Sequence, residues 1–356
     1  MKSNQQSRSK APLSPKKAAR RKRIIRRRII GGVCAGLLVL LGGGILWGGW
    51  YINKALSLMK TEQVSDPGFQ VPGASEPPKI VSMDPNDYNA ACVSDISVKG
   101  DSSYITNYLI LGLNQNLADT NILVSINTRE KTIQLISILR DTAVTITRDD
   151  GSTREAKLNA SHSSGGITLH RRTIEDNFRL RIDRYLTLDF GVFTYAVDQL
   201  GGVDIELNKA EAQFLLKKNK AGVYHLNGQQ ALTYTRDRHH TTIDGARDDF
   251  GRTERQRRML FAIFDKAKQN PITLTSKLLN IISQANVKTT VPKDQLLDIG
   301  IKGLTDYKDY KQIARSIPTN KNVVEHWIGK SQAIALKDPV RSVLELHEWI
   351  YGKPEA

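Results

Sequence analysis

The feature that most constrains this chain is a run of 24 residues without a charge, residues 29–52 (IIGGVCAGLLVLLGGGILWGGWYI). An α-helix of that length, rising about 1.5 Å per residue, is about 36 Å long and spans a hydrocarbon core of about 30 Å. A cleavable signal peptide is the alternative interpretation, but its apolar region is usually only about 7–15 residues long. Here Trp47, Trp50 and Tyr51 end the run as interfacial aromatic residues do. The run therefore predicts one N-terminal transmembrane helix that is retained.

Basic residues are concentrated in front of this run. The formal net charge is +16, and 12 of the 52 Lys and Arg residues lie within residues 1–28, where there is no Asp or Glu. Such a tail is also typical of nucleic-acid-binding arms, but the positive-inside rule explains it without a nucleic-acid partner. We therefore expect a single-pass protein of the cell membrane, with residues 1–28 in the cytoplasm and the C-terminal domain outside the cell.

The remainder of the chain divides into a spacer and one domain. Residues 53–103 are a spacer and lead-in, because prolines and turn residues between 61 and 90 interrupt any apolar periodicity. Beyond it, runs rich in Ile, Leu and Val predict strands buried on both faces. The predicted strands are 108–113, 122–126, 133–139, 142–147, 185–188 and 203–205; the predicted helices are 167–178, 190–200, 228–235, 253–269, 274–285, 293–303 and 340–351. This order predicts a single three-layer α/β/α domain with a mixed central sheet over residues 104–352.

Two groups of charged residues follow apolar elements. Arg140 and Asp141 come directly after the predicted strand 133–139, at the kind of strand end where α/β sheets bind ligands. A guanidinium group suits phosphate, although, taken alone, these two residues are better explained as a plain structural Arg–Asp pair. The second group surrounds a loop between two predicted helices, and Thr253 is the predicted cap of the second helix. This group, RDR at 236–238 and DDFGRTERQRR at 248–258, suits an anion with a divalent metal, or is a solvated run of charges.

Other chemically active residues lack a recognisable pattern. The segment Gly112-Leu113-Asn114 is too short for a dinucleotide fingerprint, and no complete Walker-type phosphate loop (Gly-x-x-x-x-Gly-Lys-Ser/Thr) occurs. His162, His239 and His240 do not have the spacing of a zinc site. Serines at 161, 163 and 164 do not form a nucleophile elbow. A soluble hydrolase is therefore disfavoured.

The order of the segments resembles a known family. NYLILGL, ADTNILVSINTREKTIQLISILRDT, KLNA, TLDFGVFTYAVDQLGGVDI, LNGQQALTYTRDR and DDFGRTERQRRML follow one another between residues 104 and 351. Any one of them is unremarkable, but the full order is similar to that of the LytR–CpsA–Psr (LCP) family. Members of that family attach glycan polymers to bacterial peptidoglycan.

The resemblance implies a function and a site. It implies a membrane-anchored extracellular phosphotransferase that takes a polyprenyl-diphosphate-linked glycan, such as teichoic acid or capsule, and transfers the glycan phosphate to peptidoglycan. Its implied partners are the lipid-linked glycan, the peptidoglycan acceptor and the membrane, and its implied cofactor is Mg²⁺. By motif position, the diphosphate-binding residues are Arg140, Arg236, Arg238 and Arg252. Asp119 and Asp249 match the acidic residues near the metal or the incoming hydroxyl, so the implied catalytic set is Arg140, Asp249, Arg252 and Asp119.

Three positions depart from the family pattern. Asn114 stands where the family often has an aspartate, Leu117 where it often has an arginine, and Leu139 where it has a proline. An amide is a weaker metal ligand than a carboxylate, and a lost arginine removes a phosphate contact. The sequence therefore leaves two functions open, an active transferase and a non-catalytic polyprenyl-glycan-binding or envelope-regulatory relative.

Overall fold

Three long strands form the middle of the central sheet. They are β2 (Ile105–Asn114), β3 (Leu117–Asn127) and β4 (Thr132–Ile138), and the side chains of β4 after its first residue are all buried. Burial of nearly all of β4 and of most of the second half of β3 explains why these two segments are rich in Ile, Leu and Val, whereas in β2 alternate residues are buried. The strands pair antiparallel, with Leu109 opposite Leu123 and Leu123 opposite Ile136.

The central sheet has seven strands and is mixed. Its order is β1-β10-β7-β2-β3-β4-β11, where β1 is Glu62–Gln63, β10 is Lys288–Thr289, β7 is Arg184–Leu188 and β11 is Lys311–Ile317. β7 runs parallel to β2, and β11 runs parallel to β4, whereas the two central pairings are antiparallel. The predicted mixed sheet is thus confirmed.

The computed structural model describes residues 93–96, 103–269 and 306–352, together with 62–63, 288–289, 291 and 302. These residues belong to one unit of the chain, Leu58–Ala356. Among them there is no helix that is both long and apolar enough to span a membrane. The predicted tail 1–28, the transmembrane helix 29–52 and the predicted helix 274–285 lie outside the described residues, as does 293–303 except for Lys302.

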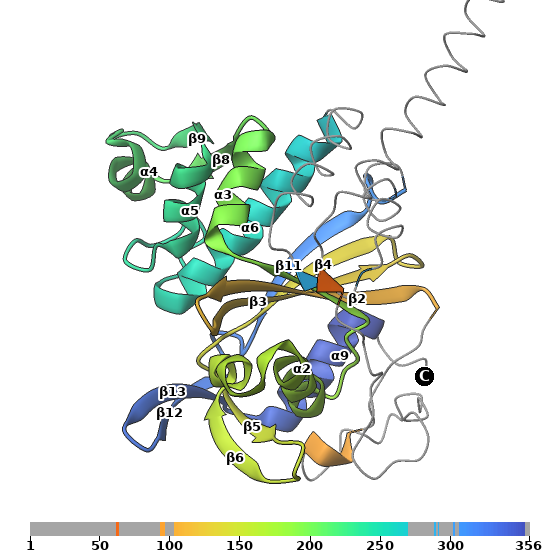
Figure 1. Ribbon diagram of the computed structural model, residues 1–356. Coiled ribbons are helices and arrows are strands. Elements are labelled where there is room, and N and C mark those ends of the chain that lie inside the picture. Colours follow the sequence, from red (N-terminus) through yellow and green to blue (C-terminus); the bar gives the residue numbers. More distant parts are fainter. Residues whose placement is uncertain are drawn as a thin grey trace, which may run out of the picture. The chain divides into compact units, whose positions relative to one another are not determined.

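Helices cover both faces of the sheet (Figure 1). One face carries α3 (Phe190–Gln199), α5 (Gly228–Arg236) and α6 (Asp248–Gln269), and beyond them lie α4 (Lys209–Leu216) and the hairpin of β8 (Val203–Leu207) and β9 (Gly222–Leu226). The other face carries α2 (Leu158–Phe178) and α9 (Pro339–Tyr351), and η2 (Val93–Asp95) packs against both. This is the expected layering.

Each helical layer has its own apolar core. Leu123, Ile136 and Phe178 are buried between the sheet and the α2–α9 layer. Val197, Leu226 and Met259 are among the side chains buried within the α3–α5–α6 layer. The side chains of the sheet therefore point into two separate interiors, and a residue at the end of a central strand lies near the border of both.

Several predicted boundaries were wrong. α6 begins at Asp248 rather than at Thr253, which is buried inside the helix and whose hydroxyl donates to the carbonyl of Phe250. The predicted helix 167–178 is the second part of α2; the pattern missed the first part, which begins at Leu158 and is divided from the second by the non-helical backbone of Gly165 and Gly166.

The C-terminal part contains strands that the sequence pattern missed. β11 completes one edge of the sheet, and β12 (Val323–Ile328) and β13 (Ser331–Leu336) form a separate hairpin. The predicted strand 142–147 exists as β5 (Ala143–Thr147), but it pairs with β6 (Thr153–Lys157) outside the central sheet.

Candidate functional site

Asp119 occupies an irregular position on β3. The register between β2 and β3 pairs Gly112 with Thr120 but Leu113 with Ala118, so Asp119 is an extra residue without a partner across the ladder. A bulge of this kind turns a side chain out of the regular alternation of a strand. Gly112 permits the close approach of the two strands, because a Cβ atom there would lie 2.8 Å from Cβ of Thr120.

Arg140 lies at the end of β4 and reaches this bulge. Its Nη1 is 2.5 Å from Oδ1 of Asp119, and its Nε is 3.4 Å from Asp141 and 3.9 Å from Asp249. Burial acts to lower the pKa of Arg140, but the hydrogen bond and charge of Asp119, with the charges of Asp141 and Asp249, raise it overall. Arg140 therefore holds a full positive charge in a partly buried place.

Asp249, in the first turn of α6, is surrounded by guanidinium groups. Its Oδ1 lies 2.9 Å from Nη2 of Arg252, 3.8 Å from Nε of Arg238 and 3.9 Å from Nε of Arg140. That oxygen is buried and accepts no hydrogen bond. We call Arg140, Arg238 and Arg252 the arginine cluster. Arg140 follows β4, Arg238 lies in the loop after α5, and Arg252 lies on α6. The fold therefore gathers them from separate stretches of chain.

Arg252 is the most deeply buried member of the arginine cluster. Only 4% of its side chain is exposed, and its Nε is buried without a hydrogen-bond partner. Burial lowers the pKa of Arg252 to about 10, and the charges of Arg140 and Arg238 act in the same direction, against those of Asp249 and Asp119. Crowded like charges, two of them largely buried, are stabilised by an anion, so this arrangement favours the binding of phosphate.

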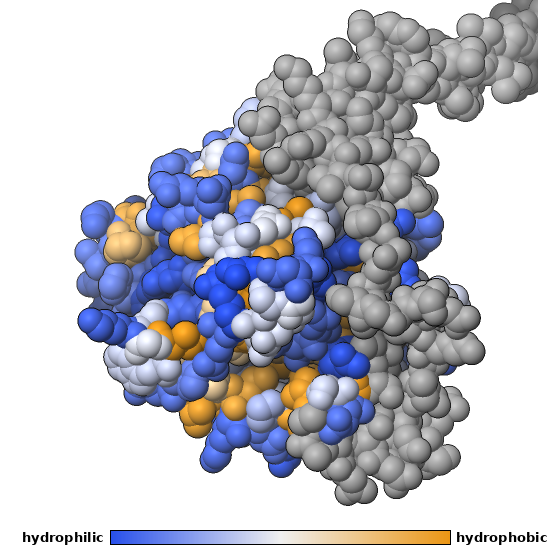
Figure 2. Space-filling view, turned by 60° about the horizontal axis from the view of Figure 1, so that its bottom comes forward, coloured by the Kyte–Doolittle hydropathy of each residue, from blue (hydrophilic) through white to orange (hydrophobic). Residues whose placement is uncertain are grey.

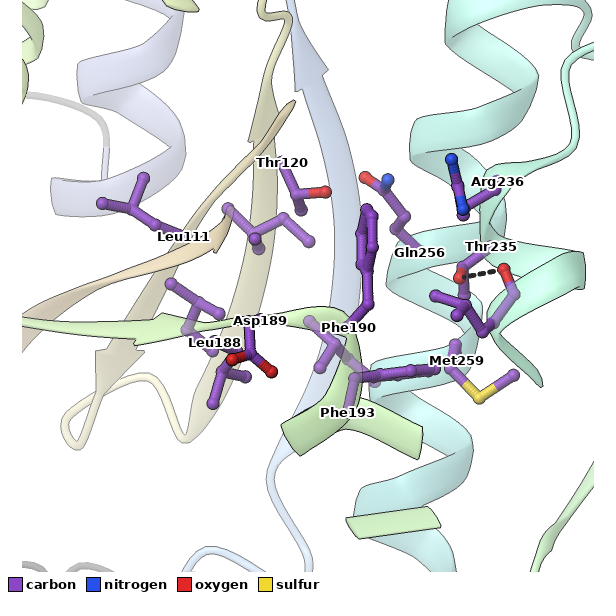
Figure 3. A pocket seen from close by; sticks show the side chains of 15 residues that line it. Leu111, Thr120, Leu188, Asp189, Phe190, Phe193, Thr235, Arg236, Gln256 and Met259 are labelled. Carbon is purple, nitrogen blue, oxygen red and sulfur yellow. Dashed lines mark hydrogen bonds between the residues drawn. The ribbon is translucent and has the colours of Figure 1, made fainter. Parts of the chain in front are cut away.

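Arg236 lies apart from the arginine cluster and borders an apolar pocket. Its guanidinium group stacks over the ring of Phe190 at 4.7 Å, and among the described residues it has no carboxylate within 4 Å. The pocket opens between the sheet and α3, α5 and α6, and Phe190, Phe193 and Met259 point into it (Figure 3). Its volume is about 80 Å³, and its other walls include Leu111, Thr120, Ile122, Leu188, Leu232, Gln256 and Leu260.

A second network, centred on Arg255, connects α6 to α4 and to the loop after α5. Arg255 is fully buried, with Nε 2.9 Å from Glu211 and Nη2 3.4 Å from the carboxylate of Asp237. It also donates to the carbonyl oxygens of Asp237 and His240. Arg255 thus fixes α6 to the loop that carries Arg238. The sequence showed Arg255 only as one charge in a run.

Ser161, His170 and Asn121 form a buried hydrogen-bond network. Oγ of Ser161 lies 2.7 Å from Nδ1 of His170, and Nε2 of His170 lies 2.8 Å from Oδ1 of Asn121. All three side chains are buried, so they do not form an accessible nucleophile. Burial lowers the pKa of His170 to about 3, with a smaller contribution from His162, so this histidine is neutral and joins α2 to β3.

The described residues fit a metal only with help from a ligand. They contain no group of three or more His, Cys, Asp or Glu side chains that could hold a metal. Asp119 and Asp249 both flank Arg140, and Oδ1 of Asp249 accepts no hydrogen bond. Mg²⁺ is commonly held by one or two carboxylates together with substrate phosphates. The two aspartates therefore fit a Mg²⁺ ion that arrives with a diphosphate.

The departures from the family pattern have visible consequences. Nδ2 of Asn114 lies 3.2 Å from Oδ2 of Asp119, so Asn114 and Arg140 occupy the two oxygens of that carboxylate. β2 and β3 are joined by a turn of only Gln115 and Asn116. Leu117, at the start of β3, is 40% exposed and offers no positive charge.

Comparisons with known proteins agree with this architecture. The family model that matches residues 92–336 is described as the LytR_cpsA_psr family. A Bacillus subtilis protein named polyisoprenyl-teichoic acid–peptidoglycan teichoic acid transferase TagV is 32% identical over 181 residues, which cover 49% of this chain and 45% of that protein. A Bacillus cereus TagU of the corresponding name is 31% identical over 208 residues, covering 57% of this chain and 66% of that protein. The chain thus spans about half to two thirds of the length of these relatives.

A solved structure shares the fold. The LytR-CPS2A-psr family protein YwtF (TagT), solved with bound octaprenyl pyrophosphate lipid, superposes with a TM-score of 0.54 at 22% identity, over 72% of this chain and 95% of that one. At this identity the likeness concerns the fold alone. With the family model covering most of the chain, and with the motif residues gathered at one site, the chain belongs to the LytR–CpsA–Psr family.

Proposed function

We propose that this protein is a membrane-anchored enzyme on the outer side of the cell membrane. It transfers the phosphate-linked glycan of a polyprenyl-diphosphate donor to a hydroxyl group of peptidoglycan. The observation that carries the proposal is that the arginine cluster and the apolar pocket share elements: Thr120 and Gln256 line the pocket, next to Asp119 on β3 and one turn after Arg252 on α6. One set of residues suits a diphosphate, and the other suits the hydrocarbon chain attached to it.

The donor is proposed to bind with its diphosphate on the arginine cluster. Arg236, at the border of the pocket, meets the phosphate nearest the lipid, and Arg140, Arg238 and Arg252 meet the phosphate that carries the glycan. Fixed guanidinium groups in a partly dry site neutralise charge on phosphoryl oxygens more effectively than mobile groups in water. The pocket volume of about 80 Å³ is small, so the aromatic walls move apart to admit the first prenyl units.

The reaction is a displacement at the phosphorus that carries the glycan. The acceptor oxygen forms a bond to this phosphorus, the bond to the bridging oxygen breaks, and polyprenyl phosphate leaves with the electron pair. Oδ1 of Asp249 has ion-pair contacts to all three members of the arginine cluster but no aligned hydrogen bond, and it is proposed to take the hydroxyl proton. Asp119, held by Arg140 and Asn114, keeps Arg140 in position. A Mg²⁺ ion bound with the diphosphate would supply further neutralisation of phosphoryl charge.

The proposed location depends on the N-terminal segments. A donor with a polyprenyl chain stays in the membrane, so an enzyme anchored by residues 29–52 meets it without diffusion through water. The basic tail 1–28 places the N-terminus in the cytoplasm by the positive-inside rule, and the domain from residue 104 on is then extracellular. Nothing in this arrangement calls for a nucleic-acid partner.

Release of polyprenyl phosphate tests the proposal. The full-length protein in detergent, given a polyprenyl-diphosphate-linked glycan, peptidoglycan fragments and Mg²⁺, is expected to release polyprenyl phosphate. Arg140→Ala and Arg252→Ala are each expected to lower kcat/KM by about 100-fold or more, because each removes a charge-assisted contact to the reacting phosphate. Arg341→Ala, at an exposed position on α9, is the matched control and should leave turnover unchanged. Wild-type turnover in both cluster variants would exclude this site.

One observation favours a second candidate, a non-catalytic binder of the same lipid. Asn114 occupies the oxygen of Asp119 that Arg140 leaves free. If the site binds without turning over, the protein will retain polyprenyl lipid on purification but will release no polyprenyl phosphate with any acceptor. The release assay therefore separates the two candidates directly.

A further inference from the structure

The hairpin of β12 and β13 presents one side chain that the proposed reaction does not use. Trp327 on β12 is 58% exposed, an unusual exposure for so large an apolar ring. Cross-strand pairing places Trp327 opposite Gln332 and Glu325 opposite Ile334, so these side chains share one face of the hairpin. On that face Nε2 of Gln332 donates to Oε1 of Glu325 at 2.8 Å. A ring and a polar hydrogen-bonded pair thus lie side by side facing solvent.

The opposite face of the hairpin fixes it to the domain. Ala333 is buried, and Nε2 of His326 lies 2.9 Å from Oε1 of Glu155 on β6. The backbone N–H of Ile334 donates to the carbonyl oxygen of Asp141 at 3.0 Å. The hairpin is therefore mounted on the segment that carries Arg140, and Trp327 is held in place rather than exposed by a loose loop.

β13 links Trp327 to Asp141, the residue after Arg140 of the arginine cluster. Gln332, opposite Trp327, is two residues from Ile334, about 7 Å along a strand at about 3.4 Å per residue. In Figure 1 the hairpin projects on the same side of the domain as the first turn of α6, which carries Asp249. A chain molecule that reaches the site with one unit would extend over the hairpin with the next ones.

We propose that Trp327, with Glu325 and Gln332, is a subsite for the sugar chain of the peptidoglycan acceptor. This inference rests on the proposed function, because it names where the acceptor of that reaction lies. A sugar ring has an apolar C–H face that packs on an aromatic ring and an edge of hydroxyl groups. The hydroxyl groups donate to carboxylates and accept from amides, which are the groups that Glu325 and Gln332 present.

Two other occupants fit this face less well. A bilayer with anionic lipids would repel Glu325, which lies on the same face as Trp327. In the view of Figure 2, the described residues show apolar patches scattered among hydrophilic ones rather than one apolar surface. A second copy of the chain would need about 800 Å² of contact on each side, whereas this face offers one ring flanked by polar groups.

Binding to peptidoglycan without donor tests the subsite. Full-length protein in detergent is sedimented with insoluble peptidoglycan stripped of other polymers. Trp327→Ala is expected to weaken binding about tenfold, or about 1.4 kcal/mol, and Trp327→Phe less, since a smaller ring is kept. Val324→Ala, 41% exposed on the opposite face of the same hairpin, should bind like the wild type. In the transfer assay, Trp327→Ala should raise KM for the acceptor about tenfold and leave KM for the donor unchanged.

Each contrary outcome has a definite meaning. Wild-type sedimentation and acceptor KM in Trp327→Ala would overturn the subsite while leaving the transferase proposal intact. Peptidoglycan binding that depends on Trp327, in a protein that never releases polyprenyl phosphate, would keep the subsite and reject the transferase. In proteoliposomes, brominated lipid quenches Trp47 and Trp50 in any case; additional quenching that is lost in Trp327→Phe would assign the Trp327 ring to the bilayer. A Trp327-dependent change in oligomeric state would assign it to a second copy.

Discussion

At the scale of single residues, Asp119 shows how a departure from a family pattern changes a site. Arg140 takes one oxygen of its carboxylate and Asn114 takes the other. A cation that used Asp119 would have to displace one of these partners. The amide of Asn114 donates a hydrogen bond where an aspartate would add a negative charge. The carboxylate of Asp119 is therefore held by one neutral donor, Asn114, and one cationic donor, Arg140.

Replacement of Asn114 tests this effect. Asn114→Asp adds a second carboxylate beside Asp119 and removes the hydrogen bond, so we expect Mg²⁺ affinity to rise by about tenfold, measured by calorimetry on the full-length protein in detergent with a polyprenyl diphosphate bound. Without metal, repulsion between the two carboxylates should lower the thermal midpoint.

Asn116→Asp is the control for charge alone. Asn116 is exposed in the same turn, and its substitution changes the net charge equally without reaching Asp119. Equal Mg²⁺ affinity in the wild type and in Asn114→Asp would show that this position has no part in a metal site.

The roles of single residues could be predicted only in part. The arginine cluster was predicted from motif position, and the structure brings Arg140, Arg238 and Arg252 around Asp249. Arg236 stands apart at the pocket, because it ends α5 and its side chain turns to Phe190. The hydrogen bond of Asn114 depends on a register shift, and local sequence carries no signal for it.

At the scale of elements, the β2–β3 bulge aims Asp119 at Arg140. Gly112→Ala would place a Cβ 2.8 Å from Thr120 and force the two strands apart. We expect a loss of about 1–3 kcal/mol in the free energy of unfolding, measured by chemical denaturation. Turnover should fall further than stability, because Asp119 no longer meets Arg140. Gly222→Ala on β9, where the added Cβ has an ordinary 3.8 Å contact, is the matched control; equal effects of the two substitutions would contradict this role for the bulge.

The contact between α2 and β3 makes stability depend on pH. Burial lowers the pKa of His170 to about 3, so between pH 6.5 and 3 the unfolded chain binds a proton that the folded chain does not. The free energy of unfolding should therefore decrease as the pH is lowered through this window, by up to about 1.4 kcal/mol per pH unit. His170→Gln should show a shallower fall in denaturation curves recorded from pH 7.5 to 4.5. Replacement of the exposed His239 should leave the pH dependence of stability as in the wild type. An unchanged slope in His170→Gln would refute this account.

Predictability also differed between elements. β2, β3 and β4 were predicted because each contributes aliphatic residues to the core, which makes the segment a run of Ile, Leu and Val. β11 (KQIARSI) pairs with β4 alone at an edge of the sheet, and its polar side chains, such as Arg315 over Trp349, hide the strand pattern. The start of α6 was missed because its first turn is DDFGR, where aspartates and a glycine resemble a loop.

At the scale of the whole molecule, the site lies where the two layers meet. Asp119 and Arg140 belong to the central sheet, whereas Asp249 and Arg252 belong to the helical layer above it. The apolar pocket opens between the same sheet and the same layer. A small shift of α3 and α6 away from the sheet would therefore widen the pocket without separating Arg252 from Asp249, since both lie on α6.

The most direct test of the central claim is the identity of the lipid that the protein carries. Mass spectrometry of the full-length protein, purified in detergent from its own membranes, is expected to find polyprenyl phosphate or diphosphate in the wild type. Arg140→Ala and Arg252→Ala should lose most of this lipid, whereas Arg341→Ala should retain it, because only the first two remove headgroup contacts. A wild-type protein without polyprenyl lipid, or equal retention in all three variants, would contradict the claim that these arginines and the apolar pocket hold one lipid together.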